Sequence, residues 1–392
     1  MFVMILNWKV GENDPFSAFN EALASYLEAS GKRSQTVELS DPGWWNRLLN
    51  AKLDGIDFVF TWQGLATNFK IGEKEQSFWE VLQVPLISMH GDHPCHMPVN
   101  HAFDSPYCAH LYAYPEYSLY AQRHFRKRSR TISVENPVFC LDERLDVKGG
   151  DHFVLPKNVT PPSVMEEEWK RQLSPEAFRF HMALAETLKA MLPTEDHLDF
   201  HAVIDELIEL HPSEEYDFRT QADAYHHLHS RLDFYVRNVK AVSILDHLKD
   251  VPLQIIGRGW EPYARVASPH HEFRRAGNMA DNQRQYYSAY GIIDVTPSVT
   301  GLHDRTYRAM RNQTPFLSSG YLPEFLPDMA PYDPLFYRFN GDDLREKCEA
   351  VMANPAAHAE LAREFSYLHQ MRIQPSHLMW QLDSLARSMD RS

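Results

Sequence analysis

Short apolar runs alternate with longer amphipathic stretches through the first part of the chain. Residues 2–6 form one apolar run, and the following stretch at 16–29 repeats its apolar residues every three or four positions, as a helix on a sheet does. Similar apolar runs recur at 56–62 and 84–89. Because parallel strands joined by helices are buried on both faces, this alternation predicts a parallel α/β sheet within residues 1–160.

The pattern changes twice further along the chain. Residues 161–248 show long helical periodicity and are expected to form a helical insert or connector. Strand-and-helix alternation resumes at 251–256, which predicts a second α/β domain at 249–360, and residues 361–392 are again helical. The expected fold class is therefore α/β, with two sheets and two cores in 392 residues.

Composition narrows the function classes. A hydrophobic content of 44% with 23% charged residues is that of a folded globular protein. The net charge of -14 disfavours nucleic acid and anionic membranes as partners, although a local basic pocket for a small anion is still allowed. No apolar run reaches the ~20 residues of a membrane-spanning helix. The cysteines have no paired spacing, which fits a reduced, cytoplasmic protein; they are Cys95, Cys108, Cys140 and Cys348.

Polar residues follow the first strand of the predicted second domain, where a doubly wound sheet binds its ligands. Two glycines here would let backbone amides approach a diphosphate, and the arginine between them would supply a guanidinium suited to phosphate oxygens. The same residues also fit a tight turn with a solvated arginine. The donor-binding candidates in this segment are Gly257, Arg258, Gly259 and Trp260, followed by Asn278 after the next strand.

A second group of candidates lies between the apolar run at 291–296 and the start of a helix. A helix N-terminus has unbonded amides and a positive dipole, so it forms an anion site that an arginine in the first turn strengthens. The alternative is that Asp304 caps the helix and pairs with Arg305. The donor-binding candidates here are Ser298, Thr300, Gly301, His303, Asp304 and Arg305.

Histidine and aspartate crowd together after the apolar run at 84–89. In one interpretation His90, Asp92 or His93 orients or deprotonates an acceptor hydroxyl. In a second, these residues and His96 bind zinc or iron in a metal-dependent hydrolase, although a helical ligand spacing such as HExxH is missing. In a third, Asp92 only caps a turn.

The order of motifs in the C-terminal part resembles a known family. Residues 255–260, 277–279, 285–290, 293–297 and 303–310 together resemble the donor domain of GT-B glycosyltransferases, within a stretch at 251–355. The resemblance is greatest to the spore-maturation-type branch of the group 1 glycosyltransferases. In that branch a His-x-Arg-like start leads into a helix with a Glu-Ala-Met-like signature.

The resemblance implies an architecture and a set of partners. Two Rossmann-like domains would face each other across a cleft, the first holding the acceptor and the second a nucleotide-diphosphate sugar. The helices at 361–392 would pack back on the N-terminal domain. Residues that follow first-domain strands would border the cleft. The acceptor or cleft candidates at these positions are Trp8, Gly11, Asn13 and Trp62. Packing in the core is an equal explanation for Trp62.

Two positions depart from the family pattern. Arg308 stands where many members carry a Glu that binds the donor ribose, and Gln313 stands where a Gly is usual. These departures keep a non-catalytic nucleotide-sugar-binding relative among the alternatives.

The leading prediction is a hexosyltransferase or related glycosyltransferase of polysaccharide or glycoconjugate biosynthesis. It would act without a metal or other cofactor, on a nucleotide sugar and an acceptor glycan, lipid or protein. A homodimer is an assembly that the sequence allows. The rival predictions are the metal-dependent hydrolase and the non-catalytic binding protein.

Overall fold

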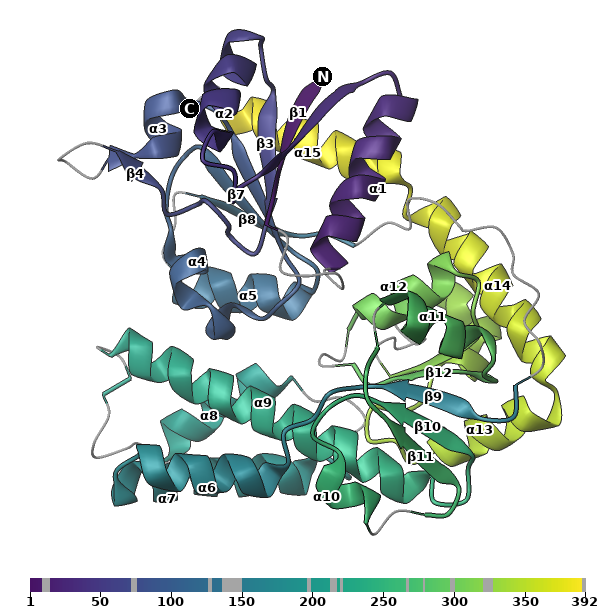
Figure 1. Ribbon diagram of the computed structural model, residues 1–392. Helices are drawn as coiled ribbons and strands as arrows, with labels where there is room; N and C mark the ends of the chain where they lie inside the picture. The colour runs from purple at the N-terminus through teal and green to yellow at the C-terminus, as the bar shows by residue number, and fades with distance from the viewer. Residues whose placement is uncertain are drawn as a thin grey trace. The chain divides into compact units, whose positions relative to one another are not determined.

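The computed structural model describes residues 1–8, 15–71, 76–125, 129–135, 150–195, 199–211, 217–218, 221–265, 268–277, 279–296, 300–319 and 327–389. The chain forms two compact units (Figure 1). One comprises Met1–Cys140 with His369–Ser392, and the other comprises Leu141–Leu368. None of the helices in the described ranges is long and apolar enough to cross a membrane.

The first unit is built on a six-stranded parallel sheet in the order β2-β1-β3-β6-β7-β8. Four of its strands are entirely buried, which explains the apolar runs at 2–6, 56–62 and 84–89 that form three of them. The strands are β1 (Phe2–Asn7), β2 (Arg33–Glu38), β3 (Phe58–Trp62), β6 (Leu86–His90), β7 (Cys108–Tyr112) and β8 (Arg130–Ser133), beside a small antiparallel pair, β4 (Lys70–Ile71) and β5 (Gln76–Ser77).

Helices pack on this sheet through the apolar side chains that the periodicity predicted. Leu23 and Leu27 of α1 join one core cluster with Val3 and Phe60, and the last helix, α15, adds Leu382 to the same cluster. The helix expected at 16–29 is confirmed as α1. The helical elements of this unit are α1 (Pro15–Ala29), α2 (Trp44–Leu53), α3 (Phe78–Leu82), η1 (Pro94–His96), α4 (Pro98–Ala102), α5 (Pro115–His124) and α15 (Pro375–Met389).

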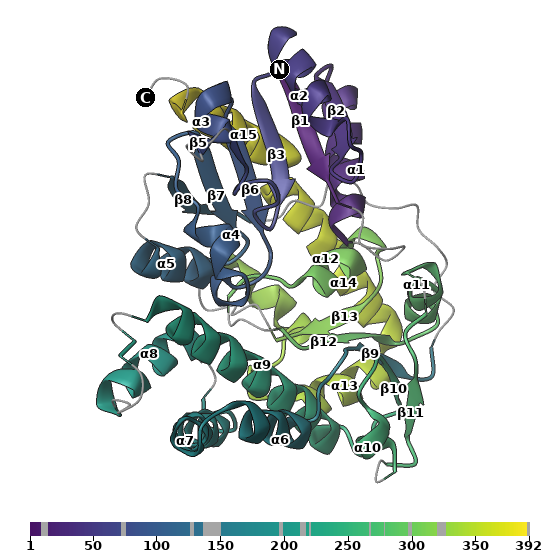
Figure 2. The ribbon, with the colours of Figure 1, turned by 60° about the vertical axis from the view of Figure 1, so that its left-hand side comes forward.

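The second unit has a five-stranded parallel sheet in the order β11-β10-β9-β12-β13 (Figure 2). Its central strand, β9, comes from the segment before the helical insert, so a boundary at residue 160 separates it from its own sheet. The unit instead begins at Leu141. The sequence predicted that these residues belong to the first domain, because they precede the helical insert. Nearly a hundred residues separate β9 from its neighbour β10 in the second sheet. The strands are β9 (Phe153–Pro156), β10 (Leu253–Ile256), β11 (His271–Arg274), β12 (Gly291–Asp294) and β13 (Phe316–Ser318).

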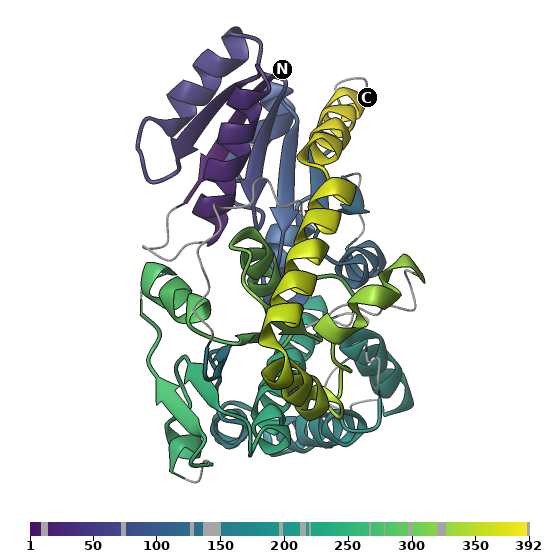
Figure 3. The same cartoon turned by 90° about the vertical axis from the view of Figure 1, so that its right-hand side faces the viewer.

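The helical insert and the second sheet share one long helix. The N-terminal part of α9 packs with α6, α7 and α8 around Trp169 and Tyr235, whereas Ile244 near its C-terminal end, and Leu248 just after the helix, pack on the sheet. On the far side of the sheet, α14 (yellow in Figure 3) packs Phe365 against Phe316 of β13. The helical elements are α6 (Pro162–Gln172), α7 (Pro175–Met191), α8 (Phe200–Leu210), α9 (Ala222–His247), α10 (Glu261–Ala264), α11 (Met279–Tyr287), α12 (Asp304–Arg311), η3 (Pro327–Leu335), α13 (Leu344–Ala353) and α14 (Pro355–Arg372).

Candidate functional site

The topology of the second sheet selects one edge as the candidate site. From β9 the sheet continues to β10 and β11 on one side, and β12 then returns to the other side of β9. Ligands of doubly wound sheets bind at the carboxyl ends of the strands where the order reverses. Here those ends belong to β9, which is followed by Lys157, and β12, which ends in Asp294.

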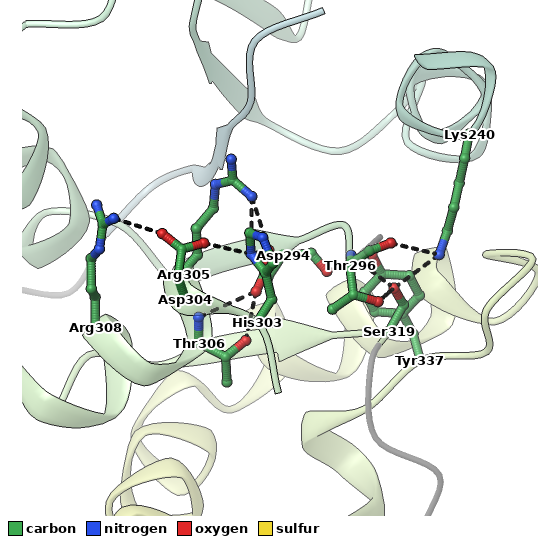
Figure 4. A network of polar contacts seen from close by, with 10 residues as sticks. All are labelled: Lys240, Asp294, Thr296, His303, Asp304, Arg305, Thr306, Arg308, Ser319 and Tyr337. Atoms are coloured by element: carbon green, nitrogen blue, oxygen red, sulfur yellow. Dashed lines mark hydrogen bonds and ion pairs between the residues drawn. The ribbon is translucent and has the colours of Figure 1, made fainter. Parts of the chain in front are cut away.

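Asp294 organises the polar network at this edge (Figure 4). Its side chain is fully buried, and Oδ2 accepts hydrogen bonds from the backbone amide and hydroxyl of Thr306 at 3.2 and 2.8 Å. Oδ1 lies 3.3 Å from Nδ1 of His303 and 3.6 Å from Nη1 of Arg305. Burial alone raises the pKa of Asp294, but the positive charges of His303 and Arg305 hold it below its ordinary value. The carboxylate is therefore ionised and anchors the start of α12.

His303 stands between this carboxylate and a second one. Its Nδ1 is 2.8 Å from Oδ1 of Asp304 and 3.1 Å from Nη1 of Arg305. The first contact requires a protonated Nδ1 and the second an unprotonated one. Burial lowers the pKa of His303, but the carboxylates of Asp304 and Asp294 outweigh it and raise the pKa overall. The two carboxylates therefore favour the protonated imidazole.

The guanidinium of Arg305 uses only part of its hydrogen-bonding capacity within the protein. The predicted alternative, a pair between Asp304 and Arg305, is not what forms: Oδ2 of Asp304 binds Nη2 of Arg308 at 2.6 Å, one turn further along α12. Arg305 reaches Asp294 with Nη1 at the long distance of 3.6 Å, and its side chain is 23% exposed. Since a guanidinium has five N–H donors, Arg305 can bind an anion without giving up Asp294.

Three further cations come to the same edge from segments that the sequence did not single out. Lys157 follows β9, and its pKa is lowered to about 7 by burial and by the nearby charges of Arg305 and Arg237. Lys240 of α9 is fully buried, with Nζ 3.1 Å from Oγ of Ser319, and burial and Lys157 hold its pKa well below the ordinary value. We call Lys157, Arg237, Lys240 and Arg305 the cationic cluster.

The members of the cationic cluster differ in how readily the sequence could have identified them. Lys157 directly follows an apolar run, so the strand-end rule used for the other candidates would have found it had β9 been recognised. Arg237 and Lys240 lie inside a 26-residue helix, where charged residues are common and only the packing of α9 on the sheet reveals their position.

The glycines of the Gly-Arg-Gly segment have a packing function. A Cβ on Gly257 would lie 2.0 Å from the carbonyl oxygen of Lys157, and one on Gly259 would lie 1.8 Å from that of Val159. Gly259 also has a φ of +85°, which favours glycine. The two glycines therefore let the chain after β10 run against the chain after β9.

The other residues of this segment divide between surface and core. The amide of Arg258 donates to Oδ1 of Asn158, and its side chain is exposed. The indole of Trp260 is 3% exposed and donates to the carbonyl of Lys157 at 2.6 Å. Among the donor-binding candidates here, Arg258 offers a side chain to a ligand, while Trp260 supports the backbone that positions Lys157.

The remaining donor-binding candidates are only partly described. Thr300 and Gly301 lie just before α12, where Gly301 has a φ of +76°. Asn278 and Ser298 fall outside the described residues.

The departure at Gln313 has a structural consequence. This residue follows the end of α12 with a φ of +54°, the left-handed conformation that commonly ends helices and favours glycine. We expect Gln313→Gly to raise the free energy of unfolding by about 1 kcal/mol, because a left-handed non-glycine residue costs roughly that much. Urea denaturation checks this, with Gln313→Ala as control; equal stability of the glycine and alanine variants would contradict it.

In the first unit, Asp92 is the exposed member of the predicted acceptor-side group. Its Oδ2 accepts a hydrogen bond from Nε2 of Gln63 at 2.7 Å. His93 is held in place, since its Nδ1 accepts from the amide of Cys95 and its ring packs edge-on against Tyr120. His90 is fully buried at the end of β6. These contacts leave Asp92 as the group that solvent can reach.

The predicted hydrolase centre does not form among the described residues. Within them, neither Asp92 nor His96 belongs to a group of three ligand atoms lying within 4.8 Å of one another. The ring of His90 instead packs with those of His101 and His110, from α4 and β7. The four residues are close in sequence, but His90 ends β6, whereas His96 ends the short helix η1 that follows the turn.

The predicted cleft residues have separate environments. Trp8 is 51% exposed just after β1, whereas Trp62 is a core residue whose ring packs against Phe16 and Phe19 and whose Nε1 donates to Oδ1 of Asn20. Packing was the second explanation that the sequence allowed for Trp62. Gly11 and Asn13 lie outside the described residues.

Comparison with solved structures identifies the fold. No family model and no curated protein matches the sequence. The chain is similar to a DNA-modifying β-glucosyltransferase solved with and without its substrate uridine diphosphoglucose, at a TM-score of 0.53, 8% identity and full coverage of both chains. The T4 phage enzyme in complex with UDP and Mn²⁺ gives a TM-score of 0.51 at 8% identity, again with both chains covered.

A third structure, Anabaena HepE in complex with UDP-glucose, gives a TM-score of 0.49 at 11% identity over the full length of both chains. At 8% identity, the likeness to the β-glucosyltransferase concerns the fold. The chain has the GT-B glycosyltransferase fold, with one Rossmann-like sheet in each unit.

Proposed function

We propose that the protein is a glycosyltransferase that moves a sugar from a nucleotide-diphosphate donor to an acceptor hydroxyl. The observation that carries this proposal is the cationic cluster at the reversal point of the second sheet. Lys157 and Lys240 are lysines whose pKa values fall first because they are buried and second because other basic groups lie near them. Such an arrangement costs stability unless an anion binds, and perturbed groups of this kind concentrate at functional sites.

A diphosphate fits the cluster in charge and in chemistry. As the bond between the sugar and the diphosphate breaks, negative charge grows on the leaving phosphate oxygens. Arg305 would bind these oxygens through two donors, and His303 and Lys157 would add positive charge close by. With these side chains in place, the proposed reaction needs no metal ion and no other cofactor.

On the acceptor side, we propose Asp92 as the general base. A base has to reach the acceptor hydroxyl, and Asp92 is exposed whereas His90 is fully buried. Gln63 orients the Asp92 carboxylate through the 2.7 Å hydrogen bond. His93 holds the turn that follows.

The donor and acceptor are proposed by class. UDP-glucose is the first donor to test, because the β-glucosyltransferase of similar fold is described with it. The acceptor is a glycan, lipid or protein, since a net charge of -14 disfavours nucleic acid. We assign the chain to the spore-maturation-type branch on its motifs, and we expect it to act in the cytoplasm.

The proposal is tested by a thermal-shift screen of nucleoside diphosphates and their sugars. A ligand that binds the folded state raises the melting temperature. We expect at least one nucleoside diphosphate to raise it and the matching sugar donor to be hydrolysed or transferred, with less than a twofold change when Mn²⁺ is added. A flat response to the whole panel would count against donor binding, and binding without turnover would favour the non-catalytic relative.

Affinity for the diphosphate should depend on pH through Lys157. Its pKa of about 7 in the free protein means that it is neutral above that pH and charged below it. A bound anion favours the charged form, so binding above pH 7 takes up a proton and weakens as pH rises. We expect the Kd to be about tenfold higher at pH 8.5 than at pH 6.5.

The matched variant for this prediction is Lys157→Arg, because arginine stays charged throughout the range. The variant should bind with nearly the same Kd at both pH values. Calorimetry measures both Kd values. Identical pH dependence in the wild type and the variant would show that Lys157 is not the group that makes diphosphate binding depend on pH.

A further inference from the structure

One face of the first sheet carries a line of polar side chains. Alternate residues of β7 share a face, so Cys108, His110 and Tyr112 all point the same way. The register pairs Tyr112 with His90 at the end of β6. The opposite face of the same two strands is apolar and belongs to the core that α1 and α15 cover, through Ile87, Met89, Ala109 and Leu111.

Three histidines meet on the polar face. His101 of α4 joins His90 and His110, and the exposed fractions of the three side chains are 1%, 0% and 0%. Nε2 of His90 lies 3.0 Å from Nδ1 of His110, and the rings of His90 and His101 are 4.2 Å apart. One ring nitrogen from each residue falls within 4.8 Å of those of the other two.

We propose that His90, His101 and His110 bind a divalent transition-metal ion, with zinc as the preferred ion. Neutral imidazoles are favoured ligands of zinc, and zinc sites often take three from one protein. Zinc–nitrogen bonds of about 2.0–2.1 Å place two ligand nitrogens of a tetrahedral site roughly 3.3 Å apart. The 3.0 Å between His90 and His110 is close to this, so small rotations of the rings admit the ion.

The surroundings match those of a metal site as well. A histidine that binds a metal usually gives its other ring nitrogen to a hydrogen-bond partner, which fixes the ring. Nδ1 of His101 lies 2.9 Å from the hydroxyl of Tyr112, and Nε2 of His110 lies 3.6 Å from Sγ of Cys108. His101 and His110 thus each have a partner on one ring nitrogen, which leaves the other nitrogen of these two rings to the proposed ion.

The ion would have a structural role. His90 ends β6 and His101 lies in α4, so one ion would fasten both ends of the segment 91–100 that carries Asp92. This role is separate from donor binding, which belongs to the second unit. Loss of the metal and loss of donor binding are therefore distinguishable results.

The test is metal analysis of the purified full chain, followed by zinc titration. We expect about one zinc per chain in the wild type and in the control His96→Ala, and at least a tenfold lower content in His101→Ala and His110→Ala. A strong chelator should lower the melting temperature of the wild type, and added zinc should restore it.

Two results would overturn the proposal. One is wild-type protein that is folded, contains no metal and takes up neither zinc nor cobalt at micromolar concentration. The other is equal metal content in the wild type and both ligand variants. If the alanine variants do not fold, cobalt titration of the wild type and of His96→Ala tests the site instead. Visible absorption typical of tetrahedral cobalt in both proteins supports the site, and the absence of that absorption contradicts it.

Discussion

Replacing Arg305 with alanine is expected to lower the rate of sugar transfer about 10²–10³-fold, the loss typical of removing one donor that stabilises developing negative charge. Arg305 is the member of the cationic cluster that begins a helix, is part-exposed and has donors beyond its contact with Asp294. The fold should persist, because the Asp294 carboxylate still binds Thr306 and His303. Steady-state kinetics with saturating donor measures the effect.

The matched control is Arg345→Ala. This arginine of α13 is 53% exposed and pairs with Glu349 and Asp250, so its removal should leave the rate within twofold. Wild-type turnover by Arg305→Ala, or an equal loss in Arg345→Ala, would refute the role given to Arg305. A melting temperature measured on both variants separates a lost function from a lost fold.

The second large effect is expected for Asp92→Asn, which should lower kcat about 10²–10⁴-fold, the range that general-base catalysis contributes. Asparagine keeps an oxygen for the hydrogen bond from Gln63, so the turn should stay in place. Because Asp92 is proposed to act on the acceptor, the affinity for the nucleoside diphosphate should not change. Transfer kinetics and calorimetric titration of the same protein give both quantities.

Asp54→Asn serves as the control for this variant, since Asp54 is an exposed aspartate of the same unit that makes one long contact with Arg33. It should transfer sugar at the wild-type rate. An Asp92→Asn enzyme that keeps its rate would exclude Asp92 as the base. An Asp92→Asn enzyme that loses diphosphate affinity in parallel would mean that the substitution disturbs more than the acceptor.

The buried strands with continuous apolar runs and the helix with one regular apolar face were predictable, and the short strand β9, whose partners are far away in sequence, was not. The apolar runs at 2–6 and 84–89 and the helix at 16–29 appear as β1, β6 and α1. The central strand β9 is only four residues long, and its partner β10 follows a long helical insert. Nothing local to residues 153–156 indicates which sheet they join.

The candidate site shows the same division. Arg305 and His303 could be found from the chain, because a strand end and a helix start lie close together in sequence there. Asp294 lies within the apolar run at 291–296 and was not among the candidates, yet its buried carboxylate orders the network. Lys240 is invisible to motif reasoning, because its position depends on how α9 packs against Thr296 and Ser319.

Calorimetric titration tests most directly whether the second unit binds a diphosphate. The wild type and Arg305→Ala are each titrated with UDP and with UMP. We predict one site per chain. UDP, or another nucleoside diphosphate, should bind at least tenfold more tightly than its monophosphate, and Arg305→Ala should lose that preference. A wild-type protein that binds no nucleoside diphosphate, or binds mono- and diphosphates equally with and without Arg305, would contradict this prediction.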